Sequence, residues 1–332
     1  MTEQELHTLF SSFARLNVLI VGDVMVDAYL WGDAERISPE APVPVISVTR
    51  KEQRPGGAAN VALNIRSLGG NVAVASVVGD DSAGKNLIHL FKDNGVGTDV
   101  IIQSSQRVTT VKTRIISHQQ HMLRVDEEQT GDLSAEDENR LLETIKVYIS
   151  SNKPDVILFE DYNKGVLTES LIAKIISLAN EKSIPTCVDP KKNNFFSYKN
   201  VTLFKPNLKE LREGLKTDID KNNDRQIVDA VYELERRIGN KISLITLSER
   251  GVFYKSGDEY EILPAHVRNI SDVSGAGDTV IAVAALCLAA KLPVKKIAAI
   301  SNLAGGLVCE YVGVVPVNKE QLLNEAKNEL VQ

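Results

Sequence analysis

Short apolar runs alternate with helical patterns along most of this chain, and this alternation limits the possible folds more than any other feature. The run Leu16 to Val21 has no polar face, as expected for a strand that is buried on both sides of a parallel sheet. Similar runs are Val72 to Val78, Val156 to Phe159, Thr186 to Val188, Val201 to Phe204 and Ile242 to Leu247. Helical patterns lie between them at Ala58 to Leu68, Ala83 to Asn94, Ala135 to Ser150, Thr168 to Glu181, Leu208 to Gly214 and Asp224 to Ile238, and two helices, Gly275 to Ala290 and Val294 to Cys309, close the sequence. The order predicts a doubly wound, mostly parallel α/β sheet flanked by helices.

Two segments, about 28–49 and 109–127, break the alternation. They contain short β-like pieces at Tyr29 to Gly32, Pro44 to Val48, Thr110 to Ser117 and His121 to Asp126. Strands joined by short turns cannot enter a parallel sheet, which needs crossover connections. We therefore expect a small β-sheet lid inserted into one domain that covers residues 1–332, because no linker marks a second domain.

Composition excludes several classes of partner. The net charge of the 332 residues is −6, which argues against a surface for nucleic acid. The longest apolar stretch, Val280 to Ala290, is too short for a bilayer, and the acidic N-terminus does not resemble a signal peptide. The three cysteines have no CxxC spacing, as is usual in a reducing compartment. These features predict a cytoplasmic protein without a membrane or nucleic-acid partner.

The segment Asp272 to Asp278, DVSGAGD, is the strongest chemical motif and leads into a long apolar helix. Gly275, Ala276 and Gly277 allow close approach of a ligand to the first N–H groups of that helix, which attract anions. Asp278 lies in the first turn and is suited to act as a general base beside a bound phosphoryl group. The alternative is a glycine-rich turn in which the acidic residue only favours the helix start. No GxxxxGK[ST] motif is present.

A second cluster, Gly56-Gly57-Ala58-Ala59-Asn60, also enters a helix. Its glycines would let substrate hydroxyls meet backbone N–H groups, and the Asn60 amide can both donate and accept. In isolation, a glycine-rich helix start with a surface asparagine explains these residues equally well.

Taken together, these motifs resemble those of the ribokinase-type (PfkB) carbohydrate kinases. DVSGAGD resembles the C-terminal signature of that family, and GGAAN resembles its substrate signature. Asn207-Leu208-Lys209-Glu210 is similar to the NxxE motif linked to Mg²⁺ and phosphate, and Thr246 to Gly251 is similar to the strand end that touches the nucleotide. Gly22-Asp23 with Asp27 resembles the first-strand substrate site. The resemblance covers nearly the whole chain and implies a ribokinase-like fold.

Within that family the chain is most similar to the D-glycero-β-D-manno-heptose-7-phosphate kinases. The segment from Gly22 to Val48, GDVMVDAYLWGDAERISPEAPVPVISV, carries this resemblance, together with His118 to Asp126, Glu160 to Gly165 and Val188 to Asn194. The family signature usually has Thr where this chain has Val273, a change that heptose kinases share. Many heptose enzymes add a nucleotidyltransferase domain with an HxGH motif. None of the five histidines has that spacing, so we expect the kinase domain alone.

The resemblance implies ATP-dependent phosphorylation of the anomeric hydroxyl of the heptose 7-phosphate, in ADP-heptose synthesis for lipopolysaccharide or other surface glycans. Asp278 would be the base, with Gly275, Ala276 and Gly277 stabilising the transferred phosphoryl group. The implied ATP contacts are Asn207, Glu210, Ser248, Gly251, Ser274 and Asn302, with Gly305 and Gly306 near the adenine. Asn207 and Glu210 would hold Mg²⁺ through water, and a K⁺ site beside Asp272 and Val312 to Val314 is left open. The implied substrate contacts are Asp27, Gly56, Gly57, Asn60, Arg124, Asp161, Lys164 and Lys191, with Arg36 as a weaker candidate for the remote phosphate.

Two other functions remain open at this level: a kinase of the same family for another sugar or a nucleoside, and an inactive protein that binds sugar phosphates. The resemblance also implies a homodimer in which the lids of two subunits cover each other's exposed strand edges.

Overall fold

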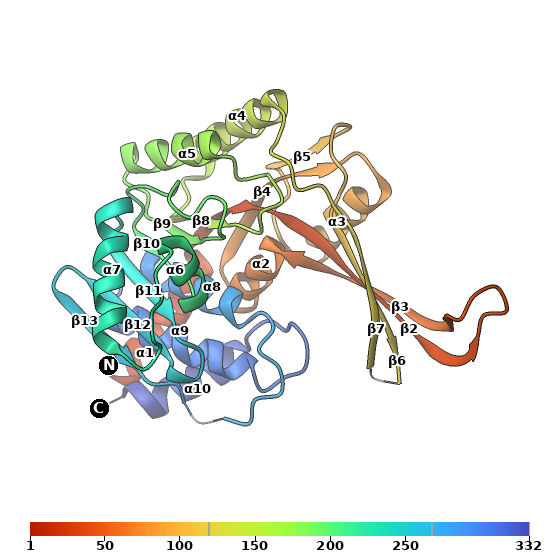
Figure 1. The fold of residues 1–332 in the computed structure, drawn as a ribbon. Helices are drawn as coiled ribbons and strands as arrows, with labels where there is room; N and C mark the ends of the chain where they lie inside the picture. Colours follow the sequence, from red (N-terminus) through yellow and green to blue (C-terminus); the bar gives the residue numbers. More distant parts are fainter. Residues whose placement is uncertain (119, 267, 332) are drawn as a thin grey trace.

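A nine-stranded sheet forms the centre of the computed structural model, which describes residues 1–118, 120–266 and 268–331 (Figure 1). Its strands, in spatial order, are β13 (Glu259–Leu263), β12 (Val252–Ser256), β11 (Ile242–Thr246), β10 (Leu203–Phe204), β9 (Thr186–Asp189), β8 (Val156–Glu160), β1 (Asn17–Gly22), β4 (Asn71–Gly79) and β5 (Ile101–Ser104). The strands from β5 to β11 are parallel. The predicted α/β fold is confirmed, and the antiparallel hairpin of β12 and β13 extends one edge of the sheet.

Strand β1 shows why its sequence has no polar face. Val18 and Ile20 belong to one hydrophobic core, and Leu19 and Val21 belong to a second core on the opposite side of the sheet. The first core includes residues of α1 (Glu3–Ser12), α2 (Ala58–Ser67), α3 (Ser82–Asp93), α8 (Ala276–Ala289), α9 (Val294–Val308) and α10 (Lys319–Leu330). The second includes residues of α4 (Ala135–Asn152), α5 (Glu169–Glu181), α6 (Leu208–Leu215) and α7 (Asp224–Ile238). Two layers of helices therefore enclose the sheet.

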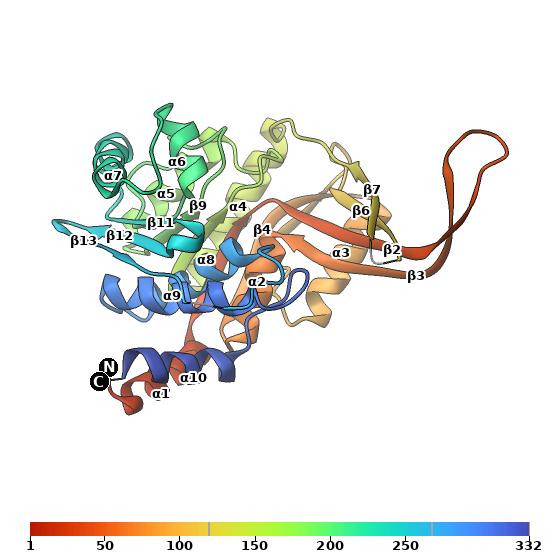
Figure 2. The same cartoon turned by 60° about the horizontal axis from the view of Figure 1, so that its bottom comes forward.

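Some predicted boundaries and elements were wrong. Only Leu203–Phe204 of the run Val201 to Phe204 pairs as a strand. A further helix, α10, follows the two closing helices that the sequence predicted. It was not predicted from the sequence because its apolar stripe of Leu322, Leu323 and Ala326 is narrow. This helix packs against α1, so the two chain ends lie side by side in both views (Figures 1 and 2). The Met1 amino group donates to the Leu330 carbonyl at 2.9 Å.

The lid is a separate four-stranded sheet in the order β3 (Pro44–Gly57), β2 (Val24–Ile37), β6 (Val111–Ser117) and β7 (Gln120–Glu127). Figure 2 shows the β2–β3 hairpin projecting well beyond the main sheet. Strands β2 and β3 are longer than predicted, because much of the lid is exposed and so lacks the apolar pattern that marks a buried strand. Pro44 and Pro55 fit here because β3 is an edge strand.

The connections of the sheet reverse at β1 and β8. From β1 the chain passes to β4 on one side, whereas from β8 it passes to β9 on the other side. In open α/β sheets, ligands bind outside the carboxyl ends of the strands at such a switch point. Gly22-Asp23 follows β1, and Asp161-Tyr162 follows β8, so these residues meet at this place.

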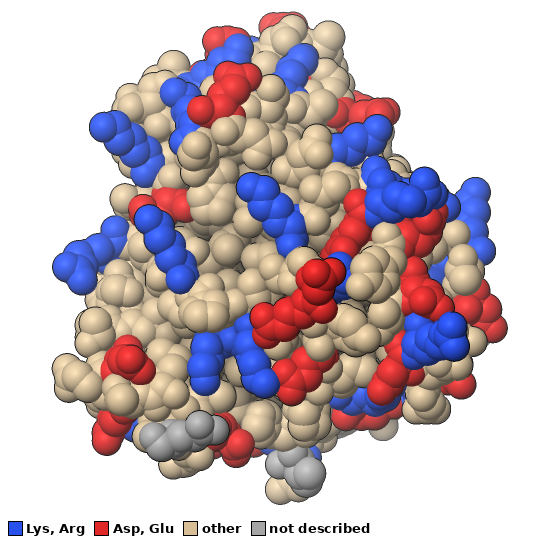
Figure 3. Space-filling view, turned by 90° about the vertical axis from the view of Figure 1, so that its left-hand side faces the viewer, with Lys and Arg blue, Asp and Glu red and all other residues tan. Residues whose placement is uncertain are grey.

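The outer surface supplies two further observations. Lys and Arg side chains are interspersed with Asp and Glu side chains on the face drawn in Figure 3. Among residues 1–118, 120–266 and 268–331, no helix combines the length and the apolar character that crossing a membrane requires.

Candidate active site

The DVSGAGD segment forms the N-terminus of α8. Gly275 is the N-cap residue and has a φ of 78°, a left-handed conformation that glycine adopts without strain. Its carbonyl accepts from the Thr279 N–H at 3.0 Å, which closes the first turn. The N–H groups of the first turn have no partner within a helix and lie at its positive end. Asp278 lies in this turn and remains partly exposed.

The GGAAN segment approaches Asp278 from the N-terminus of α2. Gly57 is the N-cap residue of α2, and the next residue, Ala58, donates its N–H to the Asp23 carbonyl at 2.9 Å. One turn into the helix, Asn60 Nδ2 donates to Asp278 Oδ2 at 2.5 Å. The two motifs that the sequence singled out are therefore in direct contact, and Asn60 is a buried side chain rather than a surface asparagine.

The second oxygen of Asp278 has a partner that the sequence reasoning missed. The Tyr162 hydroxyl donates to Asp278 Oδ1 at 3.0 Å. Tyr162 lies in the loop after β8, and its backbone N–H donates to Asp23 Oδ2 at 2.9 Å. The sequence signal was its place in the EDYNKG segment, directly after a central parallel strand, where ligand-binding residues concentrate.

Three carboxylates gather at this end of the sheet. One oxygen from each of Glu160, Asp189 and Asp278 lies within 4.8 Å of the others. Burial raises the pKa of Asp278, the Asn60 hydrogen bond opposes this shift, and the charge of Asp189 adds to it. Burial raises the pKa of Glu160 well above its usual range, and Asp189 and Asp278 raise it further. Asp278 is therefore a stronger base than an exposed aspartate.

A buried lysine balances part of this negative charge. Lys205 Nζ lies 2.8 Å from Asp189 Oδ2, and a Cβ added to Gly277 would lie 3.7 Å from the same nitrogen. Burial disfavours the Lys205 charge, but Asp189 and Glu210 outweigh burial and raise its pKa. The sequence reasoning missed Lys205, whose only signal was its place just before Asn207 at a strand end.

The Asn207–Glu210 motif is a reciprocal cap on α6. Asn207 Oδ1 accepts from the Glu210 N–H, and Glu210 Oε2 accepts from the Asn207 N–H, both at 2.8 Å. This capping box fixes the Glu210 side chain, which therefore does not lie on a solvated helix face. The other oxygen, Oε1, accepts from Lys191 Nζ at 2.9 Å. Lys191 is thus held among the acidic groups near Asp278, because it also lies 3.8 Å from Asp189.

A cavity of about 630 Å³ lies beside the DVSGAGD segment. Its walls include Asn207, Ser248, Gly251, Ala276, Gly277, Asn302, Gly305 and Gly306. Asn302 Nδ2 donates to the Pro264 carbonyl at 2.8 Å, which fixes one wall. A Cβ on Gly305 would lie 2.6 Å from Val280 Cγ2, so this glycine serves the contact between α8 and α9 as well as the cavity. Ser274 lies outside this lining, and its hydroxyl donates to Asp272 Oδ1 at 2.8 Å.

The other side of Asp278 faces the start of the lid. Asp27 on β2 lies opposite Arg54 on β3 by strand register, and a Cβ on Gly56, two residues farther along β3, would collide with the Asp27 carboxylate. Arg114 of β6 lies 2.5 Å from Asp27 Oδ1. Asp27 therefore contacts the start of the GGAAN segment, and Asn60 at its end contacts Asp278.

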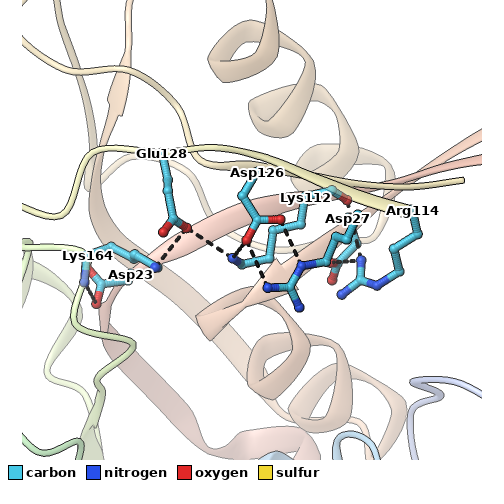
Figure 4. A network of polar contacts seen from close by, with 8 residues as sticks. Asp23, Asp27, Lys112, Arg114, Asp126, Glu128 and Lys164 are labelled. Atoms are coloured by element: carbon cyan, nitrogen blue, oxygen red, sulfur yellow. Dashed lines mark hydrogen bonds and ion pairs between the residues drawn. The ribbon is translucent and has the colours of Figure 1, made fainter. Parts of the chain in front are cut away.

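A chain of charged side chains connects the lid to the loop after β8, as Figure 4 shows. Glu128 Oε2 lies 2.8 Å from Lys164 Nζ and 3.0 Å from Lys112 Nζ. Lys112 also lies 2.9 Å from Asp126, which accepts from Arg124 as well. Lys164 and Arg124 were predicted substrate cations, whereas Lys112 and Arg114 were missed, because nothing in their sequence context separates them from surface cations.

Two acidic residues serve the loop between residues 161 and 166. Asp161 is buried and accepts from the Asn163 N–H and the Tyr198 hydroxyl, both at 2.8 Å. Asp23 accepts from the N–H groups of Tyr162, Lys164 and Val166. The predicted remote-phosphate candidate Arg36 lies nine residues beyond Asp27 on β2, roughly 30 Å away along an extended strand. Arg36 is therefore out of reach of a sugar bound at Asp27 in the same subunit.

Comparison with known proteins identifies the family. The sequence profile described as pfkB family carbohydrate kinase matches residues 15–321. The protein named bifunctional protein HldE from Geobacter sulfurreducens is 37% identical over 97% of this chain, which spans 65% of that relative's length. The bifunctional protein HldE of Methylobacillus flagellatus is 38% identical over 99% of this chain and 67% of the relative. A crystal structure of phosphofructokinase-2 from Escherichia coli in complex with potassium superimposes on 93% of this chain and 97% of the phosphofructokinase chain. The TM-score is 0.77 at 17% sequence identity, which supports the ribokinase-like fold. The chain therefore belongs to the pfkB family of carbohydrate kinases, as its motifs predicted.

Proposed function

We propose that the chain transfers the γ-phosphoryl group of ATP to the C1 hydroxyl of D-glycero-β-D-manno-heptose 7-phosphate, in ADP-heptose synthesis for lipopolysaccharide or another surface glycan. The observation that carries this proposal is the position of Asp278, held by Asn60 and Tyr162 between a nucleotide-sized cavity and a lid rich in cations. The HldE relatives and the heptose-kinase motifs support the choice of sugar. Because the reaction needs ATP, we place it in the cytoplasm.

In the proposed reaction, Asp278 removes the proton from the C1 hydroxyl as its oxygen attacks the γ-phosphorus of ATP. A new bond forms between O1 and this phosphorus, the bond to the bridging oxygen of ADP breaks, and its electron pair leaves with ADP. A positioned base contributes typically ~10²–10⁴-fold to the rate. The Gly277 N–H, together with Lys205, would stabilise the charge on the phosphoryl oxygens. Ala276, whose N–H donates to the Val273 carbonyl at 3.3 Å, would line the same helix start.

A kinase of this family uses ATP and a divalent metal, and the described residues fit both. The cavity beside Gly277 suits the nucleotide, with Ser248, Gly251 and Asn302 in its walls. Asp189 Oδ1 is buried and has no hydrogen-bond partner among the described residues. Lys191 Nζ lies 3.8 Å from this oxygen and 2.9 Å from Glu210 Oε1, so Glu210 is close to Asp189. We propose that Glu210 and Asn207 hold Mg²⁺ through water, where it would neutralise phosphate charge. Asp272 accepts from the Gly313 N–H at 2.9 Å, and this junction is the proposed place for K⁺.

The remote 7-phosphate needs cations near the lid. Lys164 and Lys112 are mostly covered, with 16% and 15% of their side chains exposed, and both contact Glu128. Arg124 lies on the adjacent strand β7. We propose that these three bind the 7-phosphate, since phosphate is a stronger partner than a single carboxylate for clustered cations. Lys191 contacts Glu210 instead, so we propose that it faces the phosphates of ATP.

We further propose that residues 1–332 act as one kinase domain that pairs through its lid. Strands β3 and β7 are the two edges of the lid sheet. Exposed apolar side chains lie on or next to its strands, at Ile37, Val43, Val48, Met122, Leu123 and Val125. Open edges and apolar side chains are commonly covered by a second copy. Light scattering should report a dimer at micromolar concentration, and a monomer would contradict the pairing.

A panel of acceptors tests the proposed activity. The chain would be incubated with ATP, Mg²⁺ and one of heptose 7-phosphate, the same heptose without its phosphate, ribose, fructose 6-phosphate or adenosine. We expect ³¹P NMR to show an anomeric phosphate only with the heptose 7-phosphate, and weak turnover of the unphosphorylated heptose. Turnover of ribose without turnover of the heptose phosphate would contradict the assignment.

A further inference from the structure

We propose that Tyr162 is a positioning residue for phosphoryl transfer, whose hydroxyl holds the Asp278 carboxylate in the orientation and ionisation state that the base needs. This inference rests on the proposed function only in assigning proton removal to Asp278. Its structural part concerns a contact between two side chains and can be tested without a sugar.

Asp278 is held by one hydrogen-bond donor on each of its carboxylate oxygens. Tyr162 donates to Oδ1 at 3.0 Å, and Asn60 donates to Oδ2 at 2.5 Å. One donor on each oxygen fixes the plane of the carboxylate, which neither donor could do alone. A carboxylate has about four lone-pair sites, so the two hydrogen bonds still leave sites for a substrate hydroxyl.

Tyr162 itself is fixed by two contacts besides the one with Asp278, one at its backbone and one at its ring. Its N–H donates to Asp23 Oδ2 at 2.9 Å, and Asp23 is anchored by two further N–H groups of the same loop. Lys191 Nζ lies 5.5 Å from the centre of the Tyr162 ring, within the range of a cation–π contact. Lys191 is in turn held by Glu210. The loop that carries Tyr162 is therefore held by the protein itself. The Tyr162 hydroxyl is in place for Asp278 before a substrate binds.

Charged side chains from several elements surround the pair of Tyr162 and Asp278. Asp278 faces Glu160 of β8 and Asp189 of β9, and the charge of Asp189 opposes its ionisation, whereas Lys205 after β10 favours it. Lys191 lies over the Tyr162 ring and contacts both Asp189 and Glu210. Burial, followed by the charge of Asp278, raises the pKa of Tyr162 well above its usual range, so its hydroxyl stays a donor. A donor to an ionised carboxylate stabilises the charged form.

Removal of the hydroxyl should therefore make Asp278 harder to ionise. In Tyr162→Phe, the pKa of Asp278 should rise by about one unit, which is the size of shift that one hydrogen bond to a charge supplies. The acid limb of the kcat/KM profile should move to higher pH by the same amount, and activity should recover in part at alkaline pH. A loss of structure alone would lower activity equally at every pH.

A matched control is available in Tyr198. Its buried hydroxyl also donates to a carboxylate of this loop, Asp161, at 2.8 Å, but the structure gives it no contact with Asp278. Tyr198→Phe removes the same atom from the same region and should leave the pKa of Asp278 unchanged. Tyr162→3-fluorotyrosine keeps the ring in place and donates more strongly, so it should lower the pKa of Asp278.

The deciding experiment is carboxyl titration by ¹³C NMR on the full chain with ¹³Cγ-labelled aspartate, with the Asp278 signal assigned by its loss in Asp278→Asn. A higher pKa of Asp278 in Tyr162→Phe, with no change in Tyr198→Phe, supports the inference. An unchanged pKa in Tyr162→Phe, or an equal shift in both variants, overturns it. Should Tyr162→Phe not fold, the 3-fluorotyrosine variant decides by the presence or absence of the opposite shift. Failure of the heptose assay would overturn the proposed function while leaving this titration decisive.

Discussion

Asn60 Nδ2 lies 2.5 Å from Asp278 Oδ2, although the two residues are 218 positions apart in the chain. The contact joins the N-termini of α2 and α8, two helices that pack against each other on one face of the sheet. It makes the two glycine-rich motifs one site, in which the group proposed to meet the sugar also orients the proposed base.

Replacement of Asn60 by Ala should lower kcat more than it weakens ATP binding. The variant loses a hydrogen bond to a charged group, worth about 1.5–3 kcal/mol, so kcat should fall roughly tenfold to a hundredfold. Because this hydrogen bond favours the ionised form of Asp278, the acid limb of the rate profile should also move to higher pH. Steady-state kinetics between pH 5 and 9 would measure both effects.

The control for this variant is Asn71→Ala. Asn71 lies at the opposite end of the sheet, at the start of β4, and its amide donates to the Ala14 carbonyl. Its rate profile should match that of the unmodified chain. Equal pH–rate profiles for Asn60→Ala and Asn71→Ala would show that Asn60 has no role in the reaction.

Two glycines of the DVSGAGD segment should respond differently to a methyl group. A Cβ on Gly277 meets nothing closer than Lys205 Nζ at 3.7 Å and Asp189 Oδ2 at 3.9 Å. Gly277→Ala should therefore keep or raise the free energy of unfolding, by about 0.5–1 kcal/mol, since alanine suits a helix better than glycine. The methyl group would occupy phosphoryl space, so kcat/KM should fall roughly a hundredfold.

Gly275→Ala, in contrast to Gly277→Ala, should lower the free energy of unfolding. Its φ of 78° is unfavourable for alanine by about 1–2 kcal/mol, and the new Cβ would lie 3.0 Å from both Asn60 Nδ2 and Val314 Cγ1. Thermal denaturation of the two variants separates the effects. A Gly277→Ala chain that is as unstable as Gly275→Ala would show that Gly277 serves the fold rather than the phosphate site.

The sequence predicted the parts of this site in which backbone and side chain act locally. The alternation of strands and helices places Asp23 and Asn207 after strand ends, and the signature glycines mark helix starts. Asn207 and Glu210 were selected through their resemblance to the NxxE motif, and the structure shows that their spacing of three positions forms a reciprocal cap.

The parts that sequence could not predict depend on contacts between distant segments. Tyr162 and Lys205 gain their roles from Asp278 and Asp189, which lie on other strands and helices. Most of β3 and the far end of β2 are exposed, so the full length of these strands left no apolar pattern in the sequence. The sequence around Lys112 does not distinguish it from a surface lysine. Its role depends on its contacts with Asp126 and Glu128, which form only when β6 pairs with β7.

Asp23 should contribute to folding through the loop that it anchors. Its buried carboxylate accepts three backbone N–H groups, and asparagine would replace one acceptor oxygen by a donor. Asp23→Asn leaves at least one buried N–H unsatisfied, which should lower the free energy of unfolding by about 1–3 kcal/mol. Urea denaturation would measure this loss, with the exposed hairpin residue Asp258, as Asp258→Asn, for comparison.

The pH dependence of stability should also identify Asp23. Burial, with a contribution from Asp161, raises the pKa of Asp23 to about 6. The ordinary value in an unfolded chain is about 3.9, so between these values the folded state binds more protons than the unfolded state. The contribution of Asp23 to stability should therefore fall as pH rises from about 4 to about 6. Asp23→Asn should lack this component; a difference in unfolding free energy between the two chains that stays constant over this range would contradict the assignment.

The central claim is that Asp278 takes the proton of the sugar hydroxyl. The most direct measurement compares turnover and ATP binding in Asp278→Asn and the unmodified chain, by coupled ADP release and by calorimetry. Turnover of heptose 7-phosphate should fall by at least about a hundredfold, since a positioned base is worth ~10²–10⁴-fold, while the Kd for ATP stays unchanged. Near-normal turnover in Asp278→Asn would contradict the account.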